Sequence, residues 1–179
     1  ELRLQITESL KQSGGDDEAK DGMDMGLLVV DYGTNRIEFS GAYNPCFRVR
    51  RLSEEEAQKI SEDSDEKADG SMSNGKYILE TIFASKMPIG ISSRMNEQFV
   101  FYEWELERGV SYYMSSDGYI DQFGGDHGRK FMKKNFKRFI LEIQDHPMET
   151  QRELLEKNLI DWMGPTPQID DILVLGIKL

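Results

Sequence analysis

Two groups of aspartate residues stand where strands are expected to end or begin. Asp117 follows the apolar run YYMSS and precedes Gly118, which lets the backbone turn sharply beside a ligand. Asp170 and Asp171 precede the apolar run ILVLGI. If the two strands are neighbours, these carboxylates converge at one sheet edge and suit a hard cation such as Mg²⁺ or Mn²⁺. The residues alone leave an alternative, in which each aspartate caps a turn or a helix.

Other kinds of chemistry find little support in the sequence. The two histidines, His127 and His146, fall in an expected loop and at an expected helix start, and the single cysteine, Cys46, fits strand packing. Neither a P-loop nor a dinucleotide-binding glycine motif occurs. The net charge of −11 argues against nucleic acid and against an anionic membrane surface as partners. No apolar run reaches the length of a membrane span.

More than half of the net negative charge lies in one segment. Residues 53–70 hold eight acidic residues and two lysines, and the polar continuation adds no hydrophobic period. We therefore expect a disordered-type insertion at about 53–75, because such a segment buries too little apolar surface to offset its ordering entropy. A calcium loop that begins at Asp65 is an alternative. It would place Lys67 and Lys76 at positions three and twelve, where such loops need oxygen ligands.

Hydrophobic periodicity predicts a helix, a run of strands, two further helices and a final strand. The first helix is expected from Leu2 to Leu10, and the later helices from Arg129 and from Pro147. Strands are expected at residues 25–32, 36–42, 46–52, 76–84, 98–106, 110–116 and 169–179, the first of them buried. Strands in consecutive runs favour antiparallel sheets, and the segregation of helices from strands favours an α+β fold.

Four motifs in the expected order resemble one known family. SSDGYIDQFGG is similar to the second Asp-Gly motif of bacterial PPM-type serine/threonine phosphatases of the SpoIIE/RsbU group, and IDDILVLGI resembles their closing Asp-Asp strand. LVVDYGTNRIEFSGAYNP and KMPIGI resemble two further segments of that family. The resemblance implies an α-β-β-α sandwich of two antiparallel sheets, as in type 2C phosphatases. Residues 1–179 would form a single partial domain that lacks its N-terminal part.

The resemblance also implies a site and a reaction. Two Mn²⁺ or Mg²⁺ ions would activate a bridging water to attack a phosphoserine or phosphothreonine. Asp117 and Asp170 would be metal ligands, and the residues lining or supporting the site would be Gly118, Asp171, Asp24, Asp121 and Asn44. The family's earlier Gly-Asp and Asp-x-x-Gly-His-Gly segments have no counterpart here, so we expect this chain to be inactive or nearly so alone.

The same resemblance implies partners. The substrate would be a phosphorylated protein, with an anti-sigma-factor antagonist as the expected example. The chain would be the output module of a bacterial signalling protein, joined to an upstream sensor domain. It would be cytoplasmic, or the cytoplasmic part of a membrane-anchored sensor, and the opening helix is compatible with a homodimer linker. The alternative is a degenerate, non-catalytic interaction module with a phosphatase fold.

Overall fold

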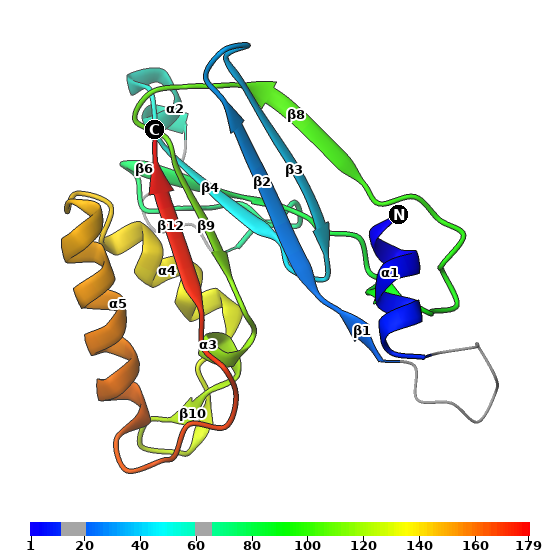
Figure 1. Ribbon diagram of the computed structural model, residues 1–179. Helices are drawn as coiled ribbons and strands as arrows, with labels where there is room; N and C mark the ends of the chain where they lie inside the picture. Colours follow the sequence, from blue (N-terminus) through cyan, green and yellow to red (C-terminus); the bar gives the residue numbers. More distant parts are fainter. Residues whose placement is uncertain (12–20, 60–65) are drawn as a thin grey trace. The chain divides into compact units, whose positions relative to one another are not determined.

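The computed structural model describes residues 1–11, 21–59 and 66–179 (Figure 1). Its helices are α1 (Leu2–Ser9), α2 (Glu54–Lys59), α3 (Gly118–Asp121), α4 (Lys133–Glu142) and α5 (Met148–Met163). Its strands are β1 (Gly22–Met23), β2 (Met25–Asp31), β3 (Arg36–Ala42), β4 (Cys46–Arg51), β5 (Met72–Ser73), β6 (Tyr77–Ile82), β7 (Ile89–Gly90), β8 (Phe101–Glu105), β9 (Ser111–Ser115), β10 (Phe123–Gly124), β11 (Arg129–Lys130) and β12 (Val174–Lys178). The chain forms two compact units, residues 1–46 with 83–106 and residues 47–82 with 107–179.

The first unit is built on a three-stranded sheet with the order β2-β3-β8. Both pairings are antiparallel, as predicted. Asp31 closes the β2–β3 hairpin, because its Oδ1 accepts the backbone N–H groups of Gly33 and Thr34 at 2.8 and 3.1 Å. Hydrogen bonds from the side chain and backbone of Thr34 and from the backbone of Gly33 lower the pKa of Asp31. This turn fixes the register of the sheet.

Strand β2 differs from its prediction as a buried strand. Leu27 and Val29 are 50% and 40% exposed, whereas the alternate residues Leu28 and Val30 are half-buried. The alternating exposure means that one face of the strand is open, so β2 is half-buried rather than buried on both faces. The second edge strand, β8, has the predicted alternation of exposed and half-buried residues.

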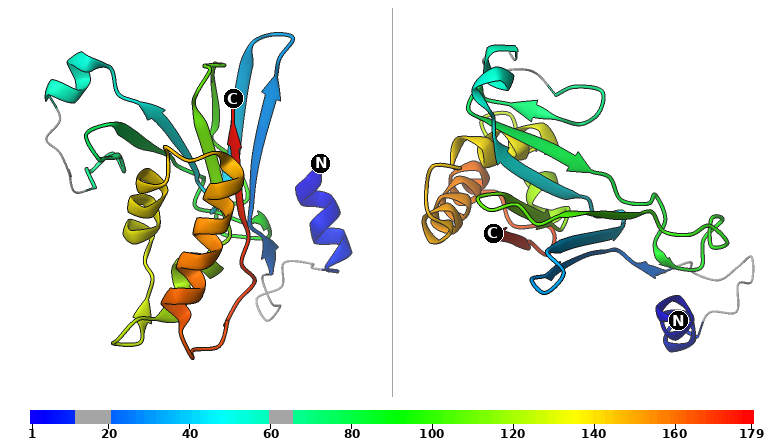
Figure 2. Two further views of the ribbon diagram at one scale, coloured as in Figure 1. Left: turned by 90° about the vertical axis from the view of Figure 1, so that its left-hand side faces the viewer. Right: turned by 90° about the horizontal axis from the view of Figure 1, so that it is seen from above.

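The second unit is a five-stranded sheet with the order β12-β9-β4-β6-β5. Helices α4 and α5 cover one face of this sheet (Figure 2). The core between the helices and the sheet consists of Phe47, Val49, Met72, Leu79, Tyr113, Tyr119, Phe131, Phe136, Ile140, Leu141, Ile143 and Leu155. The helix predicted from Pro147 is confirmed, with Pro147 at its N-cap. The helix predicted from Arg129 begins later, because Arg129 and Lys130 pair with β10 instead.

The described parts of the acidic segment, residues 53–59 and 66–75, contain regular secondary structure. Glu54–Lys59 form α2, and Met72 pairs with Leu79 and is only 3% exposed. These described parts have secondary structure that the local hydrophobic pattern did not indicate, and the expected insertion as a whole stays a prediction. The first position of the alternative calcium loop, Asp65, lies outside the described residues.

Buried polar side chains join α5 to β9 and to α3. The Tyr113 hydroxyl lies between two glutamine side chains, donating to Gln151 Oε1 and accepting from Gln144 Nε2. The Tyr119 hydroxyl donates to the Leu155 carbonyl oxygen at 3.0 Å. Burial raises the pKa of both phenols.

Among the described residues, no helix combines the length and the apolar composition needed to cross a bilayer.

Candidate functional site

Strands β9 and β12 are direct neighbours in the second unit. They pair antiparallel with Ser115 opposite Val174 and Ser111 opposite Lys178. The end of β9 and the start of β12 therefore lie at the same edge of the sheet. The predicted convergence of the two aspartate groups required that the two strands be neighbours, and β9 and β12 are neighbours. The closing strand itself begins at Val174, so Asp170 and Asp171 lie in the irregular segment before it.

Ser116 ties the two motifs together beyond the last strand pair. Its backbone N–H donates to the Leu173 carbonyl oxygen at 3.0 Å. Its hydroxyl donates to the Asp171 carbonyl oxygen at 2.8 Å and accepts the Leu173 N–H at 2.9 Å. The prediction assigned no role to Ser116, although it stands in the serine position of the Ser-Asp-Gly motif. The Ser116 hydroxyl thus accepts the Leu173 N–H in place of a backbone carbonyl oxygen. Its bond to Asp171 also fixes the approach of residues 171–173.

Gly118 allows the closest approach between the motifs. It is buried at the start of α3, and a Cβ atom built on it would lie closer than 3.0 Å to the Asp171 carbonyl oxygen. Real Cβ atoms essentially never show such a separation. The glycine is therefore required by packing against another backbone rather than by an unusual φ angle. Gly118 thereby lets the Asp171 backbone approach the residue next to Asp117, and its predicted place at a site stays a prediction.

Asp117 and Asp170 are exposed at this edge. Asp117 occupies the N-cap position of α3, yet its side chain makes no capping hydrogen bond. Within the described parts of the chain, its carboxylate has no hydrogen-bond or ion-pair partner. Asp170 Oδ1 accepts the N–H of Asp171 at 2.7 Å, which leaves its second oxygen open. Open carboxylate oxygens fit the donor set that Mn²⁺ and Mg²⁺ prefer.

The remaining predicted site residue of this unit is Asp121. Its backbone N–H bonds to the carbonyl oxygen of Asp117 at 2.9 Å, within the short helix α3. Its carboxylate forms an ion pair with Lys130 Nζ at 2.8 Å. Asp121 thus holds β11 to α3, and Lys130 is a strand residue rather than part of a solvated helix.

Asp24 and Asn44 belong to the first compact unit. Asp24 lies between β1 and β2, not within a strand. Asn44 lies in the turn after β3, and its backbone N–H donates to the Ala42 carbonyl oxygen at 2.7 Å. Their predicted places at the site stay predictions.

Gln122 is a support residue that the sequence prediction missed. It is fully buried, and its Nε2 donates to the Pro167 carbonyl oxygen at 2.9 Å. Its backbone oxygen accepts the indole N–H of Trp162 at 3.0 Å. Gln122 therefore links the segment after Asp117 to the end of α5 and to the residues that lead into Asp170. A polar residue within YIDQFGG gave no periodic signal by which it could be found.

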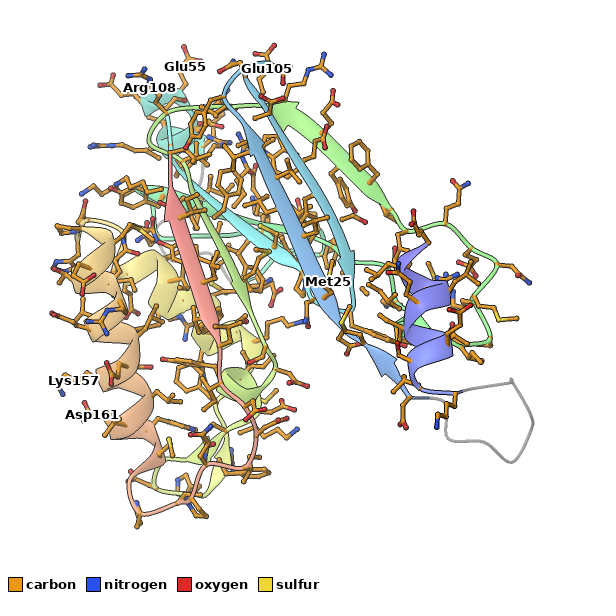
Figure 3. The ribbon with its side chains drawn as sticks, in the orientation of Figure 1. Met25, Glu55, Glu105, Arg108, Lys157 and Asp161 are labelled. Atoms are coloured by element: carbon orange, nitrogen blue, oxygen red, sulfur yellow. The ribbon has the colours of Figure 1, made fainter. Side chains whose placement is uncertain are left out.

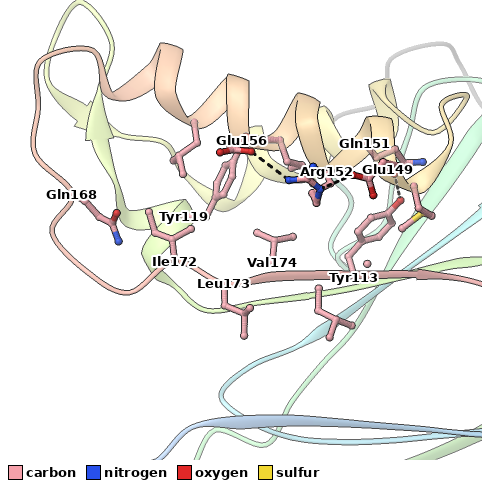
Figure 4. A pocket seen from close by; sticks show the side chains of 15 residues that line it. Tyr113, Tyr119, Glu149, Gln151, Arg152, Glu156, Gln168, Ile172, Leu173 and Val174 are labelled. Atoms are coloured by element: carbon pink, nitrogen blue, oxygen red, sulfur yellow. Dashed lines mark hydrogen bonds and ion pairs between the residues drawn. The ribbon is translucent and has the colours of Figure 1, made fainter.

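A pocket of about 660 Å³ borders the same segment, between α5 and β12 (Figure 4). Gln168 and Ile172, on either side of the aspartate pair, contribute to its wall. Much of the remaining wall is apolar, with Leu155, Leu159 and Val174. The cation in its lining, Arg152, is neutralised by Glu149 at 2.8 Å and by Glu156 at 3.5 Å. The pocket suits an apolar group better than a phosphate.

Solved structures with the same fold are phosphatase domains. The SiaA-PP2C domain of Pseudomonas aeruginosa aligns with a TM-score of 0.65 and 24% identity over 87% of this chain. The chain has a PP2C-type phosphatase fold. A second match is the Mn-presoaked phosphatase domain of the cell fate determinant SpoIIE from Bacillus subtilis. Its TM-score is 0.52 and its identity 15%, over 99% of this chain and 73% of that one.

The PP2C-type fold confirms the predicted fold family. The chain spans about half of the SiaA-PP2C chain, 51%. No family model matches the sequence, and no curated protein matches it. At these levels of identity the likeness concerns the fold, and the chemistry of the site rests on the residues described above.

Proposed function

We propose that this chain is part of a metal-dependent phosphoprotein phosphatase in which Asp117 and Asp170 bind Mn²⁺ or Mg²⁺. The observation that carries the proposal is the meeting of the two aspartate motifs at the β9–β12 edge, secured by Ser116 and Gly118. The carboxylate of Asp117 caps no helix and has no partner among residues 1–11, 21–59 and 66–179, which supports a ligand role better than the alternative of a helix cap. The shared fold with phosphatase domains makes hydrolysis of a phosphate ester the corresponding reaction.

The residues of the chain would supply ligands and rigidity. Bound ions of this kind lower the pKa of a bound water and neutralise phosphoryl oxygens. Asp117 and Asp170 contribute anionic oxygens from two segments that are distant in sequence. Ser116 holds the segment that carries Asp170 and Asp171, while Gly118 leaves room for its backbone. A site supported from both sides loses less binding free energy to ordering of its ligands.

The test is release of phosphate from a phosphoserine or phosphothreonine peptide by the natural protein that carries this chain. We expect the rate to depend on Mn²⁺ or Mg²⁺ and to fall at least about a hundredfold in Asp117→Asn and in Asp170→Asn. The matched control is Asp161→Asn, which removes an exposed carboxylate that pairs with Lys157 on α5 (Figure 3). An unchanged rate in Asp117→Asn would show that the assignment is wrong.

Metal binding provides a readout that is independent of turnover. Mn²⁺ should broaden the NMR signals of residues 116–118 and 170–171, because paramagnetic relaxation falls steeply with distance from the ion. Asp117→Asn should remove this broadening, and Asp161→Asn should keep it. Broadening confined to other acidic residues would place the ion elsewhere and contradict the proposal.

One observation favours the alternative function, a non-catalytic interaction module. In the described parts of the chain, no group of three or more His, Cys, Asp or Glu side chains is arranged to hold an ion. If the natural protein neither binds Mn²⁺ nor releases phosphate, this alternative replaces the enzyme. The finer expectations of the sequence also remain proposals: a role as a bacterial signalling output, an upstream sensor domain and a homodimer. An anti-sigma-factor antagonist in its phosphorylated form is the first protein substrate to test.

A further inference from the structure

A second pocket lies at the opposite end of the five-stranded sheet. Its volume is about 550 Å³, and all of its lining residues belong to the second unit. The ends of β4 and β12, the start of α2 and the turn that precedes β9 form its wall. Lys178 in this wall pairs with Ser111, at the other end of the strand pair from Ser115 and Val174. Four residue steps of strand separate the two ends by about 13 Å.

The acidic residues in this wall are already paired. Glu56 receives two hydrogen bonds from the guanidinium of Arg50, at 2.7 and 2.9 Å. Glu107 accepts from Arg48 at 2.7 Å. The nearby carboxylate of Asp145 is held by Lys76 and by the Tyr77 hydroxyl, and Arg51 adds a weaker attraction. Both acidic residues of the lining are therefore engaged by arginines other than Arg51 and Arg108.

Arg51, Arg108 and Lys178 are those other cations. All three are exposed, and none has an ion-pair partner within the described parts of the chain. Arg108 projects at the end of the sheet where β12 finishes (Figure 3). The lining thus holds four cations against two acidic residues, a local positive surplus in a chain of net charge −11. Mutual repulsion among the cations would be relieved by a bound anion.

The remaining wall suits a peptide rather than a free ion. Tyr77 provides half-buried aromatic surface beside the cations, while the other apolar lining residues, Leu52 and Val110, are buried. The pocket is also larger than a single phosphate group requires. Arginine side chains bind phosphate and carboxylate oxygens through paired N–H donors.

We propose that this pocket is an anion-binding site for a segment of a partner protein, with a phosphorylated or acidic side chain contacting Arg51, Arg108 and Lys178. A phosphorylated side chain and an acidic side chain both present an anionic oxygen group on a peptide. The site would dock or regulate rather than hydrolyse, since it lies away from Asp117 and Asp170. It does not depend on the proposed phosphatase activity.

The test is an NMR titration of the protein in metal-free buffer at constant ionic strength. The probes are a phosphoserine peptide, the same peptide with glutamate in place of phosphoserine, and the unmodified peptide. We expect saturable shifts of the amides of residues 51, 108–110 and 178 with the first probe. Binding of the glutamate peptide with similar affinity would assign the site to acidic segments in general, and much weaker binding would assign it to phosphate.

The decisive variant is the double substitution Arg51→Gln/Arg108→Gln. It should weaken binding at least about tenfold, because hydrogen bonds to charged groups are lost. The matched control Arg138→Gln removes an exposed cation of α4 outside the pocket. Lys178→Gln is a second, independent variant should the double variant unfold. Unchanged affinity in the pocket variants, or equal binding of the unmodified peptide, would overturn the proposal, whereas Asp117→Asn should leave this binding intact.

Discussion

The Asp171 carbonyl oxygen occupies the space in which a Cβ atom of residue 118 would stand. The two residues are 53 positions apart in the chain, and their contact joins the Asp-Gly motif to the closing strand. Because the contact is between backbones, it constrains the geometry of the edge more directly than a side-chain contact could. The stability of this edge and the properties of the candidate site are therefore coupled.

Gly118→Ala should lower the free energy of unfolding by about 1–3 kcal/mol, since the added methyl group must displace a backbone segment. Chemical denaturation measures this change. Gly33→Ala is the control, because a Cβ atom built on Gly33 meets only a side-chain oxygen, Asp31 Oδ1 at 3.2 Å, in an exposed turn. A Gly118→Ala variant as stable as the control would show that the two motifs do not pack as described.

Ser116→Ala should cost about 1 kcal/mol, because the hydroxyl donates to Asp171 and accepts from Leu173. The neighbouring variant Ser115→Ala provides a matched control at the last residue of β9. Hydrogen exchange should show faster exchange of the Leu173 amide in Ser116→Ala and little change in Ser115→Ala. Equal protection in the two variants would contradict the bridging role of Ser116.

Glu56 should titrate far below an ordinary glutamate. Hydrogen bonds from the Arg50 side chain, and next from the Ser53 backbone, lower the pKa of Glu56 from 4.5 to about 2. Its contribution to stability should be complete above pH 4.5 and lost as the pH falls through about 2. A ¹³C NMR titration of the Glu56 carboxyl group measures this midpoint. A midpoint near 4.5 would mean that the contacts to Arg50 and Ser53 do not persist in solution.

The ion pair of Lys137 and Glu66 should be sensitive to removal of either partner alone. The Lys137 side chain is 1% exposed and its Nζ lies 2.5 Å from Glu66 Oε1 and 3.0 Å from the Gly70 carbonyl oxygen. Glu66→Gln should cost about 1–3 kcal/mol, because a buried ammonium group loses its counter-charge. The double variant Glu66→Gln/Lys137→Met should recover most of this loss, since Gly70 still accepts from Thr81.

The pH dependence gives a second check on Lys137. Burial lowers the pKa of Lys137 below its usual value, so the unfolded chain binds this proton more tightly than the folded chain. Stability should therefore rise with pH in the interval below the usual lysine pKa. Denaturation midpoints at neutral and alkaline pH measure this effect. Lys137→Met should remove this part of the pH dependence, and an unchanged profile would contradict the assignment.

Local patterns in the sequence were sufficient for most strands and for the helix after Pro147. Residues 36–42 form the strand that was predicted, and Tyr102 and Trp104 are partly buried while Phe101 is exposed, as alternation requires. These elements depend on side-chain periodicity, which is a property of neighbouring residues. The Asp-Gly motif of Asp117 and Gly118 could also be recognised in the sequence, because its two residues are consecutive.

Residues whose role depends on distant partners were not predictable in this way. Met72 lies in a polar stretch but enters the core through its pairing with Leu79. Lys137 is charged yet buried, because Glu66 and Gly70 receive its ammonium group. The register of β9 and β12 decides whether the two aspartate motifs meet, and strand pairing is a tertiary choice. The sequence by itself thus determined most of the longer elements and the candidate ligands. Only the tertiary structure decided which of them share an edge, because strand pairing joins residues that are distant in the chain.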